Sequence, residues 1–287
     1  MNPQPVAIPG SEMYTMTAQY GRTYRITVSL PPAYGMPMDS DWPFHNVPPK
    51  WPIIYVLDGN WFDSVIAGIV HTTSWCGSTS DAIVVGIGYP DDADIKEAER
   101  SQFVRRAHDL TPIYDEAVEK DMEIFKRPAP SGDAGNFHRF IKDEVIPFIE
   151  TTYQADPARR ILVGHSYGGL FGLFSLFTTP DLFDTLVIGS PTLFYGKRFT
   201  FQQEEAFARE HRQLPVKMYL FAAEDEESVG DTTLTDTLRM AAILQSRKYE
   251  GFSLVKTVFA DHNHCEVAVP GIHWGLMRAL RAYADKG

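Results

Sequence analysis

The chain has few cysteines, no segment rich in lysine or arginine, and no long apolar stretch. Its 287 residues include two cysteines, Cys76 and Cys265. Two are too few for a disulfide framework or a cysteine-rich zinc site. We expect free thiols in a reducing compartment, although a single bridge between the two stays open.

Positive charge is scarce relative to negative charge. The 26 Lys and Arg residues face 37 Asp and Glu residues, which gives a formal net charge of −11. A protein that binds the nucleic-acid backbone needs a basic face, so we expect no nucleic-acid partner. The excess of negative charge favours solubility and says nothing about the reaction.

Membrane and export signals are absent from the sequence. No apolar run approaches the roughly 20 residues that cross a bilayer. Residues 1–10 have neither the basic nor the apolar segment of a signal peptide. We therefore expect no membrane partner and a cytoplasmic location.

Six short apolar runs alternate with helical patterns over most of the chain. The runs are continuous, as expected for strands that are covered on both faces of a parallel sheet. Before them, residues 12–18 and 24–30 alternate loosely and predict an antiparallel hairpin. The predicted parallel strands are 53–57, 82–87, 161–163, 186–188, 216–222 and 252–259, and the predicted helices are 62–70, 137–153, 170–177, 204–211, 234–248 and 272–284. This order predicts an α/β fold with a mostly parallel, eight-stranded sheet and helices on both faces.

One domain over residues 1–287 accounts for the length of the chain. The longest interruption of the strand–helix pattern is 91–136, a polar segment that three prolines and Gly132 break. It leaves the sheet at the carboxyl end of a strand, where open α/β folds bind their ligands. We interpret it as an insertion that forms a pocket.

The sharpest motif is Gly164-His165-Ser166-Tyr167-Gly168, between the strand run 161–163 and a helix. A G-x-S-x-G sequence in this context predicts a strained turn that exposes the serine above the sheet. The two glycines remove side chains that would collide at the bend. Ser166 is therefore the candidate nucleophile, and the alternative is an ordinary tight turn that contains a serine.

A serine hydroxyl needs a base, and after such a turn an acid and then a histidine follow in the chain. His262 and His264 both come just after the run that ends at residue 259, and either could be the base. The acid should follow the run 216–222, where four carboxylates stand together. Glu226 is our choice among them, with Glu224 and Asp225 as alternatives.

The oxyanion of acyl transfer needs two backbone N–H donors. The first is that of Tyr167, directly after the nucleophile, and the second comes from the loop after the first parallel strand. That loop reads Asp58-Gly59-Asn60-Trp61, which indicates Asn60 as the donor. The alternative is an ordinary Asp-Gly turn.

A metal site is a competing interpretation of the histidine segment. Asp261, His262 and His264 could act as ligands, but the sequence supplies no further ligand to complete the site. We expect neither a metal nor another cofactor.

Several of these segments resemble the putative-esterase family of α/β-hydrolases, most closely the branch of the siderophore (enterobactin and salmochelin) esterases. The likeness is carried by residues 55–60, 109–112, 144–147, 164–171 and 190–191, and by Tyr153. The segment 264–267 matches the family's His-x-x-Val, which favours His264 over His262. Family members often have Gly-x-x-Glu or Gly-x-x-Asp at the acid, where this chain has Ala223 in place of the glycine. Some siderophore esterases work with a Ser–His dyad, so a dyad without an acid is an alternative to the triad in this chain.

The resemblance implies a serine carboxylesterase that acts on a small-molecule ester through an acyl-enzyme. Ser166 would attack, His264 would be the base and Glu226 would orient it. Arg106 matches an arginine near the ligand in that branch, and Trp61 is a further candidate for substrate binding. The alternatives are a siderophore trilactone esterase specifically, an acyltransferase, and a non-catalytic binding protein on the same fold.

Overall fold

The computed structural model describes residues 8–37, 48–75, 77, 79–90, 95–117, 120, 130–228 and 231–284. Cys76 lies outside these residues, as do 91–94, 118–119 and 121–129 of the predicted insertion.

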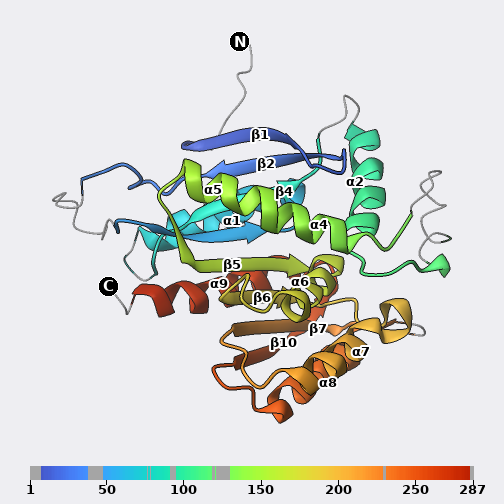
Figure 1. The fold of residues 1–287 in the computed structure, drawn as a ribbon. Coiled ribbons are helices and arrows are strands. Elements are labelled where there is room, and N and C mark those ends of the chain that lie inside the picture. The colour runs from blue at the N-terminus through green and yellow to red at the C-terminus, as the bar shows by residue number, and fades with distance from the viewer. Residues whose placement is uncertain are drawn as a thin grey trace.

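An eight-stranded sheet crosses the molecule in the order β1-β2-β4-β3-β5-β6-β7-β10 (Figure 1). β1 and β2 form an antiparallel hairpin, β2 pairs antiparallel with β4, and all other neighbours are parallel. The prediction of a mostly parallel, eight-stranded sheet is confirmed. The strands are β1 (Ser11–Thr17), β2 (Thr23–Ser29), β3 (Trp51–Val56), β4 (Ile83–Gly88), β5 (Ala155–His165), β6 (Thr185–Gly189), β7 (Lys217–Asp225) and β10 (Ser253–Asn263), with β8 (Glu227–Ser228) and β9 (Asp231–Thr232) as a separate ribbon.

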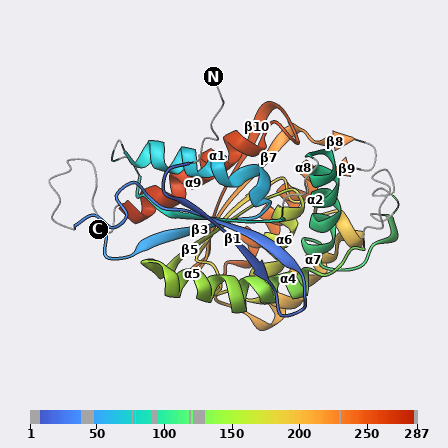
Figure 2. The ribbon, with the colours of Figure 1, turned by 90° about the horizontal axis from the view of Figure 1, so that it is seen from above.

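Helices cover both faces of this sheet. In Figure 2, α1 and α9 lie on one face, and α4, α5 and α6 lie on the other. The predicted helix 137–153 is one continuous rod in Figure 1, with a π-helical turn in its middle. The helices are α1 (Gly59–Ser74), α2 (Ile95–Asp109), α4 (Ala134–Phe140), η2 (Ile141–Val145), α5 (Ile146–Thr152), α6 (Tyr167–Thr178), α7 (Tyr195–Glu210), α8 (Thr233–Arg247) and α9 (Ala268–Ala284).

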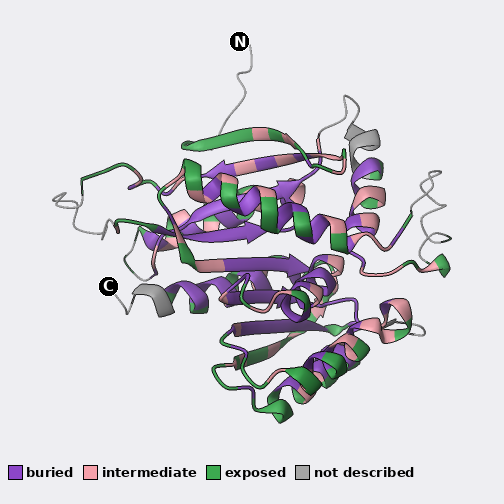
Figure 3. Ribbon diagram, in the orientation of Figure 1, coloured by how far each residue is buried: buried purple, intermediate pink, exposed green. Residues whose placement is uncertain are grey.

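The hydrophobic core has one part on each side of the sheet. Every residue of β3 and of β4 is buried, because these strands lie in the middle of the sheet and helices cover them. Ile54 and Val56 point to the side of α1 and α9, whereas Ile53 and Tyr55 point to the opposite part of the core. Figure 3 shows the outcome, with buried central strands and exposed edge strands β1 and β10. Among the described residues, no helix is both long and apolar enough to span a membrane.

The helix α2 was not predicted, since its segment was interpreted as part of a polar insertion. The buried residues of α2 include Ser101, Gln102, Arg106 and Asp109. A helix that buries polar side chains has no apolar stripe, and a search for hydrophobic periodicity cannot detect it.

Asp81, just before β4, is a buried carboxyl group that is 6% exposed and accepts a hydrogen bond from the Ala82 N–H at 2.9 Å. Burial raises the pKa of Asp81 to about 7. An aspartate in the unfolded chain has a pKa of about 3.9. The folded state therefore keeps a proton that the unfolded state loses, and stability falls as the pH rises from about 4 to about 7.

We expect Asp81→Asn to raise the free energy of unfolding at pH 8 by on the order of 2 kcal/mol and to change it little at pH 4. This gain in the free energy of unfolding is smaller than the free energy that corresponds to the pKa shift, because the new amide N–H₂ must also be accommodated. Urea unfolding at both pH values measures the effect, and the exposed Asp181→Asn serves as the control. Equal stability of Asp81→Asn and the native protein at pH 8 would contradict the assignment.

Candidate active site

The turn between β5 and α6 holds Ser166 in a strained backbone conformation, with φ 59° and ψ −119°. For a non-glycine residue this geometry costs roughly 1–3 kcal/mol and is found mostly at functional sites. Its N–H donates to the Gly189 carbonyl at 3.0 Å, and its carbonyl accepts from the Leu170 N–H at 3.0 Å. A Cβ at Gly164 would lie 2.2 Å from the Gly168 carbonyl oxygen, so the turn requires glycine there. The predicted strand–serine–helix turn is present.

His264 and Glu226 are in direct contact. His264 is the first residue after β10, and its Nδ1 donates to Glu226 Oε1 at 2.7 Å. The Glu226 side chain is fully buried, whereas the His264 side chain is 35% exposed. With Nδ1 as the donor, the neutral ring leaves Nε2 free to accept a proton.

The strand end at β7 selects one of the four neighbouring carboxylates. The second oxygen of Glu226 accepts from the Ala223 N–H at 2.9 Å, which turns the side chain inward. Glu224, Asp225 and Glu227 are exposed. Glu224 instead accepts from the Asp261 N–H at 3.3 Å. Glu226 is thus the carboxylate of this group that both is buried and meets a histidine.

The competing base, His262, has a different environment. Its Nδ1 donates to the Ala260 carbonyl at 2.6 Å, and its ring packs against Phe259. Among the described residues, the groups of metal-binding type that lie close together are His108, Asp109 and Asp133, not the Asp261–His264 segment. The guanidinium of Arg22 already contacts all three, so a cation would have to displace it.

The two predicted oxyanion donors lie in the first turns of helices. Tyr167 is the first residue of α6 and Asn60 is the second residue of α1. Backbone N–H groups at these positions have no acceptor within their own helix. The Asn60 side chain exchanges two hydrogen bonds with the Tyr89 backbone, at 2.7 and 2.9 Å. A Cβ at Gly88 would lie 2.1 Å from Asn60 Oδ1, so this anchoring requires glycine at the end of β4.

Arg106 is buried beside both of these turns. Its Nε and Nη2 donate to the two carboxylate oxygens of Asp58 at 2.8 and 2.9 Å. The guanidinium carbon lies 5.3 Å from the Trp61 ring centroid and 5.2 Å from that of Tyr167, within reach of a cation–π contact. Arg106 thereby connects α2 to the two turns that carry the candidate oxyanion donors.

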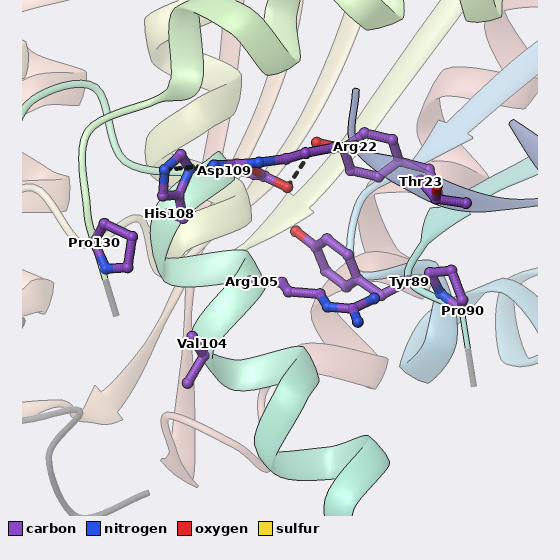
Figure 4. Close-up of a pocket in the computed structure, with 10 residues that line it drawn as sticks. Arg22, Thr23, Tyr89, Pro90, Val104, Arg105, His108, Asp109 and Pro130 are labelled. Atoms are coloured by element: carbon purple, nitrogen blue, oxygen red, sulfur yellow. Dashed lines mark hydrogen bonds and ion pairs between the residues drawn. The ribbon is translucent and has the colours of Figure 1, made fainter. Parts of the chain in front are cut away.

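A cavity of about 430 Å³ lies between α2, the start of β2 and the end of β4 (Figure 4). Arg105 reaches from α2 toward Tyr89 and Pro90 in this view, and Arg22 runs across the opposite wall to His108. Asp109, which is 1% exposed, holds this wall together because it accepts from Arg22 and from the Tyr24 hydroxyl.

The predicted Asp109–Pro112 motif therefore anchors the N-terminal hairpin to α2. Thr111 completes the anchor, with a hydrogen bond from its hydroxyl to the Ala107 carbonyl at 2.6 Å. The Gly132 N–H donates to the same hydroxyl oxygen at 2.8 Å.

Sequence reasoning assigned no role to His165, the residue before the nucleophile. Its Nε2 donates to the His264 backbone carbonyl at 2.9 Å. Burial, aided by the nearby His264 and Arg106, lowers the pKa of His165 to about 3. The place of His165 inside the G-x-S-x-G motif gave no indication of this contact, because the two residues are 99 positions apart in the chain.

Known proteins resemble this chain in sequence over most of its length. The model of the family described as "Putative esterase" matches residues 17–273. The ferri-bacillibactin esterase BesA of Bacillus subtilis is 30% identical over 232 residues, which cover 77% of this chain and 72% of that protein. The siderophore triacetylfusarinine C esterase of Aspergillus fumigatus is 31% identical over 222 residues, which cover 75% of this chain and 68% of that protein.

Solved structures share the fold. The BES protein from Bacillus cereus superposes with a TM-score of 0.80 at 24% identity, over 98% of this chain and 99% of that one. The siderophore hydrolase EstB from Aspergillus nidulans gives a TM-score of 0.77 at 24% identity, over 98% and 99%. The resemblance stated from the sequence is confirmed: the chain belongs to the putative-esterase family, in its siderophore-esterase-like branch, and has the α/β-hydrolase fold.

Proposed function

We propose that this protein is a serine carboxylesterase in which Ser166 is the nucleophile, His264 the base and Glu226 its orienting acid. The observation that carries the proposal is the 2.7 Å hydrogen bond from His264 Nδ1 to the buried Glu226. It leaves His264 Nε2 as the proton acceptor at the carboxyl ends of the parallel strands, where Ser166 also stands on its strained turn. Membership of an esterase family supports the same chemistry.

In the first half of the reaction, Ser166 Oγ attacks the ester carbonyl carbon while His264 Nε2 takes the hydroxyl proton. The carbonyl oxygen becomes an oxyanion, which the N–H groups of Tyr167 and Asn60 stabilise. The tetrahedral intermediate then collapses, the C–O bond to the alcohol breaks, and His264 gives its proton to the departing alkoxide. The product is an acyl-enzyme on Ser166.

In the second half, water takes the place of the alcohol. The water oxygen attacks the acyl carbon while His264 accepts a proton from the water. The same two N–H groups stabilise the second oxyanion. Collapse breaks the bond to Ser166 Oγ, which recovers its proton from His264, and the carboxylic acid leaves. An acyltransferase would differ only at this point, by a different acceptor.

A siderophore ester is the substrate class that the relatives favour. Both curated relatives named above are siderophore esterases and are at least 30% identical to this chain. Siderophore esters of the catecholate type carry phenolic groups that ionise readily, and Arg106 and Trp61 are our proposed contacts for them. A guanidinium beside an aromatic ring suits a planar, anionic group.

We expect the purified protein to hydrolyse p-nitrophenyl butyrate and a catecholate trilactone, with a kcat/KM about tenfold or more higher for the trilactone. The remote catechol groups supply binding energy that a short ester lacks. Rates of acid release measure both reactions. Equal or better use of the short ester would favour a general esterase, and no acid release from either ester would favour the non-catalytic alternative.

Arg106→Lys on the same two substrates tests the proposed contact. Lysine keeps the charge but cannot make the bidentate pair with Asp58. A larger loss with the trilactone than with the short ester is expected, with Arg105→Lys as the control. Equal losses of activity on both esters would mean that Arg106 only holds the two turns in place and does not contact the substrate.

A further inference from the structure

The imidazole of His165 is a buried, polar group that the mechanism above does not use. It is 7% exposed and directly precedes the candidate nucleophile. Its Nε2 donates a hydrogen bond to the backbone carbonyl of His264, at 2.9 Å. A carbonyl oxygen can only accept, so Nε2 carries the proton. Because burial lowers the pKa of His165, the ring is neutral and its Nδ1 carries no proton.

Aromatic packing fixes the orientation of this ring. It lies parallel to Phe221, at 8° with ring centroids 6.3 Å apart, and edge-on to Phe62 at 6.4 Å. Its third neighbour is the His264 ring itself, with centroids 4.8 Å apart. A Cβ at Gly189 would lie 2.1 Å from Phe221 and 2.9 Å from His165 Nδ1, so a glycine makes room for both rings. The direction of the Nε2–H bond is thereby set.

His264 is consequently held at two points. Glu226 holds the side chain through Nδ1, and His165 holds the backbone through the carbonyl. The hydrogen bond from His165 affects the position of both catalytic groups, because His165 is covalently joined to Ser166. This hydrogen bond therefore links the strained turn after β5 to the loop after β10, although β6 and β7 separate these two strands in the sheet.

We propose that His165 is a positioning residue that sets the distance between Ser166 and His264, through the Nε2–H hydrogen bond of its neutral ring to the His264 carbonyl. This inference rests on the proposed function, since it concerns the geometry of that catalytic pair. A misplacement of catalytic groups by about 1 Å can cost roughly 10²-fold in rate. The hydrogen bond acts on kcat, because it aligns groups that react and contacts no substrate.

The test compares His165→Gln with His165→Met. The Gln Nε2 stands the same number of bonds from Cα as the imidazole Nε2, so it can donate to the same carbonyl. Met fills a similar volume without a donor. We expect His165→Met to lower kcat for p-nitrophenyl butyrate by about 10²-fold with little change in KM, and His165→Gln to stay within about fivefold of the native enzyme. His138→Gln, at a histidine that is 3% exposed, is the control and should leave kcat unchanged.

Two further measurements keep the test decisive. If His165→Met does not fold, His165→Asn replaces it, since its amide is one bond too short and should lose activity where Gln keeps it. Nitrogen NMR of the native protein should show His165 as the Nε2–H tautomer. Equal kcat for the Gln and Met variants, or an Nδ1–H tautomer, would overturn the inference. An inactive native protein would instead contradict the proposed function.

Discussion

Replacing Ser166 by alanine is expected to lower kcat for p-nitrophenyl butyrate by at least about 10⁴-fold. The substitution removes the atom that forms the acyl-enzyme, and what remains is the stabilisation of the oxyanion by backbone N–H groups. Stability should change little, because alanine and serine bear the same strain at φ 59°. The loss should therefore appear in kcat while the thermal midpoint is unchanged.

Ser175→Ala is the matched control for this experiment. Ser175 is a buried serine of α6, the helix that follows Ser166, and is 1% exposed. Its variant should retain the native rate. A Ser166→Ala enzyme that keeps more than about one hundredth of the native kcat would rule out Ser166 as the nucleophile.

The second large effect is expected for Glu226→Gln, which should lower kcat by about 10³- to 10⁴-fold. The amide can still accept from the Ala223 N–H through its oxygen, so its N–H₂ group turns toward His264. Two donors then face each other, and the imidazole moves its proton to Nε2. In that tautomer His264 cannot accept a proton from Ser166.

Glu224→Gln controls for the loss of one negative charge at the same strand end. Glu224 is exposed and bonds the Asp261 N–H, so its variant should keep near-native activity. The pair also separates a triad from a dyad. Near-native kcat for Glu226→Gln would mean that Ser166 and His264 work without an orienting acid.

The strands were predictable because their signal is local. A strand in the middle of a parallel sheet is buried on both faces, and continuous apolar runs reveal this directly. The first half of β5 was missed because Asp156, Arg159 and Arg160 interrupt the apolar pattern. Most of that part of the strand is partly buried or exposed, so its residues did not have to be apolar.

The helix α2 was missed for a related reason. Its buried residues are mostly polar, and two of them, Arg106 and Asp109, bond to other elements instead of packing as apolar groups. Each partner lies far away in the chain: Asp58 is 48 positions from Arg106 and Tyr24 is 85 positions from Asp109. A buried polar face is recognisable only once its partners are in place.

The candidate site also has parts that the sequence predicts and parts that only the structure reveals. Ser166 could be assigned from five adjacent letters, because the strained turn is a local structure. The choice of Glu226 among neighbouring carboxylates depends on which way the chain bends after β7, and burial separates residues that sequence position cannot. His165 stands inside the motif that identified Ser166, yet its contact with His264 is visible only in three dimensions.

Covalent labelling of the native enzyme by a fluorophosphonate tests the central claim most directly. The probe forms a phosphorus–oxygen bond with an activated serine hydroxyl and loses fluoride, so mass spectrometry of the digested protein identifies the modified residue. We predict one adduct per chain, on the peptide that contains Ser166, together with a loss of esterase activity in proportion to labelling. Labelling of another residue in step with inactivation, or full activity in a protein that the probe does not modify, would contradict the account.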